Sequence, residues 1–307
     1  MRILFMGTPD FAVPSLAALL EAGHEICGVF TQPDRPKNRG MKLQAPPVKE
    51  FALLRNIPVF QPESVKDGTA LEQIQALAPE LIAVAAYGRI LPESILNYPQ
   101  YGCINVHSSL LPKYRGSAPI HWAILNGDQQ TGVTIMHMAK AMDAGDIIAQ
   151  SVTAIDPDET VETLHDRLAV MGAELLVEVV EQIRTNTASR TAQNEQLVTY
   201  APMLSRELSP LDWTKDARQL HDQVRGLVPW PATTTDLFSA EPVKVFQTEL
   251  LAQSCKAEPG TIVAAGNDGI DIVCGDGRIL RIKQLQAQGG KRMAAGDYLR
   301  GHPIQLT

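Results

Sequence analysis

Two polar side chains close an apolar run in the first half of the chain, and their spacing suggests chemistry. Asn105 and His107 stand two positions apart, so in a β-strand their amide and imidazole groups would point to the same face. Both groups can donate hydrogen bonds to an oxygen that gains negative charge, and the imidazole can also transfer a proton. The pair therefore suits a reaction that passes through an oxyanion.

A third candidate, Asp143, lies in the turn Met142–Asp146. Its carboxylate could orient the imidazole of His107 or help a water molecule to relay protons. The pattern leaves structural alternatives open, because a histidine at a strand end and an aspartate in a glycine-containing turn often serve only the fold.

The elements that would position these residues form an α/β pattern. Strands are expected at Ile3–Met6, Ile26–Thr31, Pro58–Phe60, Leu81–Tyr87, Cys103–His107, Thr134–Met138 and Ile147–Ala154. Helices are expected at Pro14–Gly23, Pro47–Asn56, Ala70–Leu77, Pro119–Asn126 and from about Val161 to Ile183. Strands separated by such helices predict a Rossmann-like, mostly parallel sheet, which binds ligands at the carboxyl ends of its strands. Asn105 and His107 lie at such an end.

The second half of the chain has a different character. Residues 189–205 are polar and aperiodic, which predicts a linker between a catalytic domain over 1–188 and a second domain over 206–307. Short strands with frequent turns are expected in the second domain, and they indicate a small OB-like β-barrel. These strands are Val243–Gln247, Gly260–Ala265, Gly269–Val273 and Arg278–Leu285.

The first strand is followed by Gly7-Thr8-Pro9-Asp10-Phe11. A dinucleotide site would need Gly-x-Gly-x-x-Gly here, so that backbone amides can approach a pyrophosphate. One glycine and a proline do not meet this need, and we therefore exclude NAD binding.

Charge is distributed unevenly over the chain. The formal net charge is −7, which argues against indiscriminate nucleic-acid binding. Two stretches are nevertheless basic, namely residues 35–42 and residues 278–307. Each stretch alone could be ordinary solvated surface, but together they are compatible with a polyanionic partner.

The remaining bulk features favour a cytoplasmic protein. No apolar run approaches the ~20 residues of a membrane span, and Met1 is followed at once by a strand-like run, so we expect neither a membrane segment nor a signal peptide. The four cysteines show no Cys-x-x-Cys spacing and read as reduced residues, not as a disulfide frame or a zinc site.

Further motifs extend over nearly the whole chain. They are Gly7–Phe11, Thr31–Pro36, Asn105-x-His107, Ser109–Pro112, Lys113-x-Arg115-Gly116, Arg115–Ile120, Gly132–Met136, Asp143-x-Gly145-Asp146 and Pro229–Pro231. With this combination the chain resembles the folate-dependent formyltransferase family. Two positions depart from the pattern of that family: residue 108 is Ser where Gly, Ala or Pro is common, and Ala139 stands where an acid is common.

The resemblance implies a reaction and a site. Asn105, His107 and Asp143 would form the reaction centre, where an amine attacks the formyl carbon of 10-formyltetrahydrofolate and tetrahydrofolate leaves, with no metal. The folate co-substrate would bind along two loops, although the second could be an ordinary strand-to-helix turn. Its residues would be Ser109, Leu110, Leu111, Pro112, Tyr87, Gly88, Ile90 and Leu91.

The resemblance also implies an acceptor, the methionine of initiator methionyl-tRNA. Arg35, Lys37, Arg39 and Lys42 lie in a loop of about fifteen residues, a length that more often serves function than padding. This loop would reach into the acceptor stem, and the C-terminal barrel would contact the RNA backbone. We expect the loop to be unordered without RNA and the enzyme to be a monomer.

Three alternatives compete with this interpretation. A serine hydrolase using Ser108 or Ser109 is disfavoured because the Gly-x-Ser-x-Gly turn is absent. A non-catalytic RNA-binding module would not require Asn105, His107 and Asp143 together. A sister formyltransferase acting on a nucleotide sugar or on glycinamide ribonucleotide would share the reaction centre but lack the basic loop or the barrel.

Overall fold

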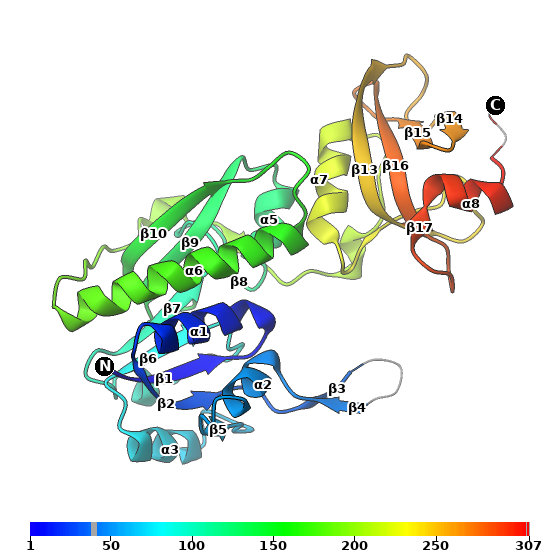
Figure 1. The fold of residues 1–307 in the computed structure, drawn as a ribbon. Helices are drawn as coiled ribbons and strands as arrows, with labels where there is room; N and C mark the ends of the chain where they lie inside the picture. Colours follow the sequence, from blue (N-terminus) through cyan, green and yellow to red (C-terminus); the bar gives the residue numbers. More distant parts are fainter. Residues whose placement is uncertain (38–41, 305, 307) are drawn as a thin grey trace. The chain divides into compact units, whose positions relative to one another are not determined.

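The computed structural model describes residues 1–37, 42–304 and 306. It contains two compact units, and the ribbon in Figure 1 shows the elements of each. The first unit comprises residues 1–119, 131–153 and 165–201, and the second comprises residues 120–130, 154–164 and 202–307.

A seven-stranded sheet with the order β10-β9-β7-β6-β1-β2-β5 organises the first part of the chain. Its strands are β1 (Arg2–Gly7), β2 (Glu25–Phe30), β5 (Val59–Phe60), β6 (Leu81–Ala85), β7 (Cys103–His107), β9 (Gln130–His137) and β10 (Ile147–Ala154). The neighbours from β5 to β7 pair in parallel, whereas β7 and β9 pair antiparallel. The predicted mostly parallel sheet is confirmed.

The helices among these strands are α1 (Val13–Glu21), α2 (Pro47–Leu53), α3 (Thr69–Leu77), α4 (Glu93–Leu96), α5 (Pro119–Leu125) and α6 (Val161–Arg184). Prolines stand in the first turn of α1 and α2. The fixed φ of proline suits this position, where its missing N–H is not needed. The five predicted helices are confirmed, and α4 is an additional helix that was not predicted, because its four residues are too few to show a helical period.

The core of the first unit explains why β1 reads as an uninterrupted apolar run. Ile3, Leu4, Phe5 and Met6 are all fully buried, as expected for a central strand of a parallel sheet that is covered on both faces. The helix α6 packs on β7 through Gly172, where an added Cβ would lie 2.8 Å from Val106.

Val106 therefore marks the α6 side of β7. Because side chains alternate along a strand, Asn105 and His107 point to the opposite face of the sheet.

The basic stretch after β2 contains a short hairpin. The strands β3 (Arg35–Lys37) and β4 (Lys42–Gln44) pair antiparallel, with Arg35 opposite Gln44. The predicted loop therefore contains regular backbone structure at these six positions. Pro36 is tolerated because a two-stranded ribbon leaves one edge of each strand unpaired. Residues 38–41 lie outside the described part of the chain.

The polar segment after α6 also carries regular structure. It holds the 3-10 turn η2 (Glu195–Leu197), capped by the side chain of Asn194, and the strand β11 (Tyr200–Ala201). This strand pairs in parallel with β8 (Arg115–Gly116). Residues 185–201 belong to the first unit, and the pairing of β11 with β8 fixes this segment beside the loop that follows β7.

The second unit is built on a six-stranded sheet with the order β12-β13-β16-β15-β14, to which β17 adds by pairing with β16. The strands are β12 (Thr233–Thr235), β13 (Val243–Ser254), β14 (Ile262–Gly266), β15 (Gly269–Val273), β16 (Arg278–Gln286) and β17 (Met293–Ala294). All pair antiparallel, which confirms the prediction of a β-rich second domain.

Two helices of this unit, α7 (Ala217–Leu227) and α8 (Ala295–Gly301), pack with the sheet. Leu220 of α7 and Tyr298 of α8 share one core with Val245 and Ile282 of the sheet.

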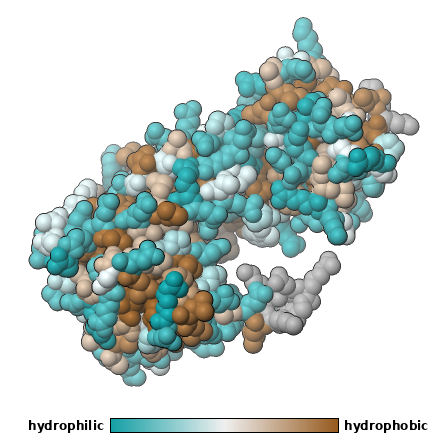
Figure 2. All heavy atoms as spheres, in the orientation of Figure 1, coloured by the Kyte–Doolittle hydropathy of each residue, from teal (hydrophilic) through white to brown (hydrophobic). Residues whose placement is uncertain are grey.

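The surface of the first unit mixes both kinds of side chain, as the teal and brown spheres of Figure 2 show. Leu53 and Leu54, at the end of α2, are among the exposed apolar residues. Scattered exposure of this kind is normal for a globular protein. In the part of the chain that the structure describes, no helix has the length and apolar content to span a membrane.

Candidate active site

The two polar residues of β7 lie at the carboxyl edge of the sheet. Asn105 pairs with Val84 of β6 and Met136 of β9, and it is half-buried. His107 is almost fully buried, with 6% of its surface exposed. Strand neighbours on both sides therefore fix the backbone of Asn105, and pairing with Thr134 of β9 fixes that of His107.

The imidazole of His107 faces a carbonyl on one edge and a carboxylate on the other. Its Nε2 lies 3.0 Å from the carbonyl oxygen of Tyr114, and because a carbonyl only accepts, Nε2 carries the hydrogen. Its Nδ1 lies 3.8 Å from Oδ2 of Asp143, which is beyond direct hydrogen-bond distance. The structure thus brings His107 and Asp143 together, with a gap that a small movement would close.

Asp143 owes its position to the loop between β9 and β10. Its φ of 51° is left-handed, a conformation that aspartate tolerates better than most residues. Its Oδ2 accepts a hydrogen bond of 2.8 Å from the backbone N–H of Gly116. Gly145 must be glycine, because an added Cβ would lie 1.7 Å from the carbonyl oxygen of His137. The Asp-x-Gly pattern therefore has a steric reason.

The loop that follows β7 is braced by β9. The hydroxyl of Ser109 donates to the carbonyl of Lys113 at 2.6 Å, so it is not directed at His107. Thr134 donates to the carbonyl of Ser109 and accepts from the N–H of Leu111. These bonds speak against Ser109 as a nucleophile.

The four residues Ser109–Pro112 differ in what they offer a ligand. Ser109 and Leu111 are buried, and the Leu111 carbonyl already accepts from Gln150 at 2.9 Å. Leu110 and Pro112 are half-buried. Apolar contact with a ligand would therefore come mainly from these two.

The backbone of a second loop, which follows β6, accepts hydrogen bonds from two side chains that lie just after β1 and β2. Thr8 donates its hydroxyl to the carbonyl of Tyr87 at 3.1 Å, and Gln32 donates its amide to the carbonyls of Tyr87 and Gly88 at 3.0 and 3.2 Å. The side chains of Tyr87 and Leu91 are buried, whereas Ile90 is 59% exposed. Burial raises the pKa of the Tyr87 phenol.

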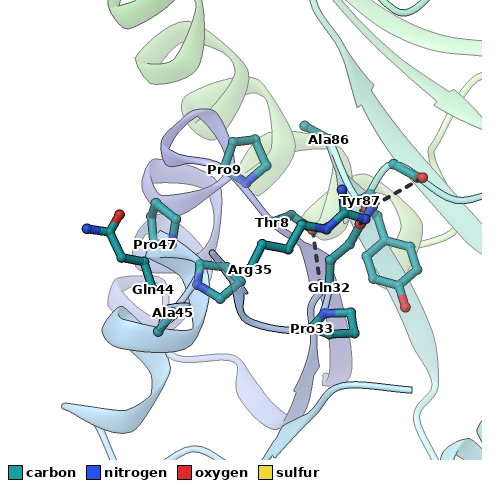
Figure 3. A pocket seen from close by; sticks show the side chains of 12 residues that line it. Thr8, Pro9, Gln32, Pro33, Arg35, Gln44, Ala45, Pro47, Ala86 and Tyr87 are labelled. Atoms are coloured by element: carbon teal, nitrogen blue, oxygen red, sulfur yellow. Dashed lines mark hydrogen bonds between the residues drawn. The ribbon is translucent and has the colours of Figure 1, made fainter. Parts of the chain in front are cut away.

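A hollow of about 370 Å³ opens beside this loop. Figure 3 shows Arg35 extending from β3 across it toward Gln32, to whose side-chain oxygen its guanidinium donates at 2.8 Å. The residues that line the hollow are Thr8, Pro9, Gln32, Pro33, Arg35, Gln44, Ala45, Pro46, Pro47, Ala86, Tyr87 and Gly88. Of the residues predicted for ligands, Arg35, Tyr87 and Gly88 line the hollow, whereas Asn105, His107 and Asp143 are not among these described lining residues.

The base of the β3–β4 hairpin is fixed by a charged cluster. Lys49 donates to both carboxylate oxygens of Asp34 at 2.8 Å, and Gln61 donates to the same carboxylate at 2.7 Å. The hydrogen bond from Lys49, followed by that from Gln61, holds the pKa of Asp34 below its usual value.

Asp34 of this cluster directly precedes Arg35, the first residue of the predicted tRNA-binding stretch. Arg35 is exposed, and Lys37 stands opposite Lys42 in the hairpin. Arg39, also predicted to meet RNA, lies outside the described residues.

Several basic side chains of the second basic stretch, residues 278–307, form ion pairs with acidic side chains from outside that stretch. Arg281 forms two hydrogen bonds with Asp271, at 2.6 and 2.9 Å, and Lys283 lies 3.5 Å from Glu249. Arg278 pairs with Asp276. These acidic partners lie in neighbouring strands and turns outside residues 278–307. A count of charges within that stretch therefore does not include them.

Three residues of the site had no role in the sequence interpretation. Gln193, Glu195 and Arg115 form one hydrogen-bonded group that reaches the loop of Asp143. Arg115 was noticed only as part of a motif. Gln193 and Glu195 lie in an aperiodic polar segment, where no local signal points to partners so far away in the chain.

Comparison with known proteins matches both halves of the chain. A family model described as formyl transferase covers residues 1–180, and one described as the C-terminal domain of formyl transferase covers residues 203–303. The chain is 49% identical to the methionyl-tRNA formyltransferase of Pelotomaculum thermopropionicum, covering 99% of this chain and 96% of that protein. It is 47% identical to that of Bacillus subtilis, with coverages of 99% and 96%.

Solved structures share the fold at low identity. The sugar 3N-formyl transferase WlaRD superposes with a TM-score of 0.70 at 19% identity, covering 92% of this chain and 97% of that one. HypX from Aquifex aeolicus superposes with a TM-score of 0.68 at 18% identity, covering all of this chain and 48% of that one. The two family models show that the chain belongs to the formyltransferase family. Its similarity over nearly the full length to the relatives from Pelotomaculum thermopropionicum and Bacillus subtilis shows that it belongs to the methionyl-tRNA formyltransferases within that family.

Proposed function

We propose that this chain transfers the formyl group of 10-formyltetrahydrofolate to the amino group of methionine on initiator methionyl-tRNA, acting in the cytoplasm as a monomer. The observation that carries the proposal is the arrangement of Asn105 and His107 on one face of β7, with the carboxylate of Asp143 3.8 Å from the imidazole. The similarity over nearly the full length to proteins named methionyl-tRNA formyltransferase favours this acceptor over a nucleotide sugar or a ribonucleotide.

In the proposed reaction the neutral amine attacks the formyl carbon. A new C–N bond forms and the formyl oxygen becomes an oxyanion, to which the amide of Asn105 donates. For His107 to donate as well, its Nε2 must exchange the Tyr114 carbonyl for the formyl oxygen. One well-placed donor of this kind contributes about 3 kcal/mol of transition-state stabilisation.

The intermediate then collapses. The bond between the formyl carbon and N10 of the folate breaks, the amine nitrogen loses a proton and the leaving nitrogen gains one. Asp143 and His107 lie close enough to share this proton transfer, directly or through a water molecule. The nucleophile is the substrate amine, so no covalent enzyme intermediate forms and the transfer as written calls on no metal.

The folate would bind along Ser109–Pro112 and along the loop that carries Tyr87, Gly88, Ile90 and Leu91. The half-buried Leu110 and Pro112 and the exposed Ile90 offer apolar contact to a flat ring. The side chains of Ser109, Leu111, Tyr87 and Leu91 are buried, so they would support the folate site by fixing the backbone of the two loops.

The hollow beside Tyr87 and Gly88 would receive the aminoacyl end of the tRNA. Two of its walls, Gln32–Arg35 and Gln44–Pro47, flank the paired strands β3 and β4, which include Arg35, Lys37 and Lys42. Prolines and alanines suit an apolar methionine side chain, and Arg35 provides a cation for a phosphate nearby.

A formylation assay tests the proposal. The protein is incubated with 10-formyltetrahydrofolate and one acceptor at a time, and the acceptor is analysed by mass spectrometry for the addition of a formyl group. Formylation of initiator methionyl-tRNA, with little on elongator methionyl-tRNA or free methionine, is expected. Formylation of an amino sugar nucleotide in place of the tRNA would overturn the choice of acceptor.

A further inference from the structure

We infer that Gln193 is a positioning residue that holds the carboxylate of Asp143 opposite His107, an inference that rests on the proposed function. Its Nε2 donates to the carbonyl oxygens of Asp143 and Gly145, at 2.7 and 2.8 Å. Its Oε1 accepts from Arg115, at 3.1 Å from Nε and 2.8 Å from Nη2. One amide therefore joins the loop of Asp143 to the loop that follows β7.

The orientation of this amide follows from its partners. A guanidinium only donates and a carbonyl only accepts, so the oxygen of Gln193 must face Arg115 and the nitrogen must face the loop. The two hydrogens on Nε2 match the two carbonyls. No other uncharged side chain of this length offers an acceptor on one side and two donors on the other.

Arg115 is fixed from its other side, which makes it a firm anchor. Its side chain is almost fully buried, and Glu195 accepts from Nη2 at 2.8 Å and from Nη1 at 3.2 Å. The hydrogen bond from Arg115 holds the pKa of the Glu195 carboxyl below its usual value. The backbone N–H of Arg115 donates to the carbonyl of Thr199 at 2.9 Å.

The next residue completes the clamp. Gly116 donates its N–H to Oδ2 of Asp143, the same atom that lies 3.8 Å from His107. Gly116 has a φ of 127°, and an added Cβ would lie 2.6 Å from the carbonyl oxygen of Ala201, so glycine is required here.

Asp143 is therefore held at both ends. Gln193 binds its carbonyl, Gly116 binds its carboxylate, and both are tied to β8. Its left-handed backbone has a conformational cost that the surrounding bonds must offset. If the bonds from Gln193 are lost, the loop can relax and carry the carboxylate away from the imidazole.

Two substitutions test the inference. Gln193→Met keeps the volume but removes every hydrogen bond, and Gln193→Glu sets a carboxylate oxygen against two carbonyls. Both should lower kcat, by about a hundredfold if the carboxylate moves by about 1 Å, while KM for folate and tRNA stays unchanged.

A second readout does not depend on the acceptor. Hydrogen exchange at the Gly116 amide should become faster in both variants, since this amide is bonded to Asp143. The matched control is Gln196→Met, at an exposed position of the same segment, and it should change neither readout. Melting temperatures are measured first; if Gln193→Glu is unfolded, the isosteric Gln193→Met carries the test.

The outcomes separate the two proposals. Wild-type kcat in a folded Gln193→Met, or a raised KM with kcat unchanged, overturns the positioning role while formylation by the wild type stands. A wild type that does not formylate methionyl-tRNA overturns the proposed function, and exchange at Gly116 then still reports whether the clamp holds Asp143.

Discussion

Oδ2 of Asp143 lies 3.8 Å from Nδ1 of His107, and this relationship joins the end of β7 to the loop between β9 and β10. The carboxylate is anchored on Gly116 while the imidazole is anchored on Tyr114. Each side chain is thus held by a backbone group of the loop that follows β7.

Asp143→Asn should test the charge separately from the hydrogen bond. The amide oxygen can still accept from Gly116, so the loop should keep its shape, but the negative charge beside His107 is lost. We expect kcat to fall by about 10²–10⁴-fold with little change in KM. Steady-state kinetics with methionyl-tRNA check this expectation. Asp146→Asn, which removes only an ion pair with the exposed Arg190, is the control, and equal losses in both variants would contradict the role of Asp143.

Asn105→Ala should remove the donor to the oxyanion. We expect kcat to fall by about 10²–10³-fold, because such a donor acts mainly in the transition state. Asn105→Asp should be at least as harmful, since it opposes the oxyanion with a charge. Single-turnover rates with both substrates saturating are the measurement. A loss confined to KM would assign Asn105 to binding.

Arg35→Ala should weaken tRNA binding through loss of one cation. If Arg35 meets a phosphate, the slope of log affinity against log salt concentration should fall by about one. Filter binding over a range of salt concentrations measures the slope. Arg184→Ala removes a cation that pairs with Glu181 on α6 and should leave the slope unchanged. An identical slope in wild type and Arg35→Ala would mean that this residue does not meet RNA.

Stability should depend on pH through His221 of the second unit. The imidazole is buried, its Nδ1 lies 2.9 Å from the hydroxyl of Thr248, and burial lowers its pKa below the ordinary value of 6.5. As pH falls below 6.5, the unfolded chain therefore binds a proton that the folded chain does not, and the free energy of unfolding decreases.

Urea denaturation between neutral and mildly acidic pH measures this dependence. His221→Gln keeps a polar group near Thr248 but cannot titrate, so its stability should decline less steeply with acidification. A variant whose stability follows the wild type at every pH would show that His221 is not the group responsible.

Local pattern was sufficient for much of this protein. Short apolar runs predicted β1, β2, β6 and β7, and helical spacing predicted α1 and α6, because both are properties of neighbouring residues. The same rule placed Asn105 and His107 on one face of a strand end.

The pattern of neighbouring residues could not predict which side chains from distant segments bind one another. The clamp of Gln193 and Arg115 on the loop of Asp143 joins side chains far apart in the chain. The acids that partner Arg281 and Lys283 come from other strands, so a basic count along residues 278–307 overstated the free charge. Hydrogen bonds and ion pairs act over a few ångströms, and only the folded chain sets which groups come that close.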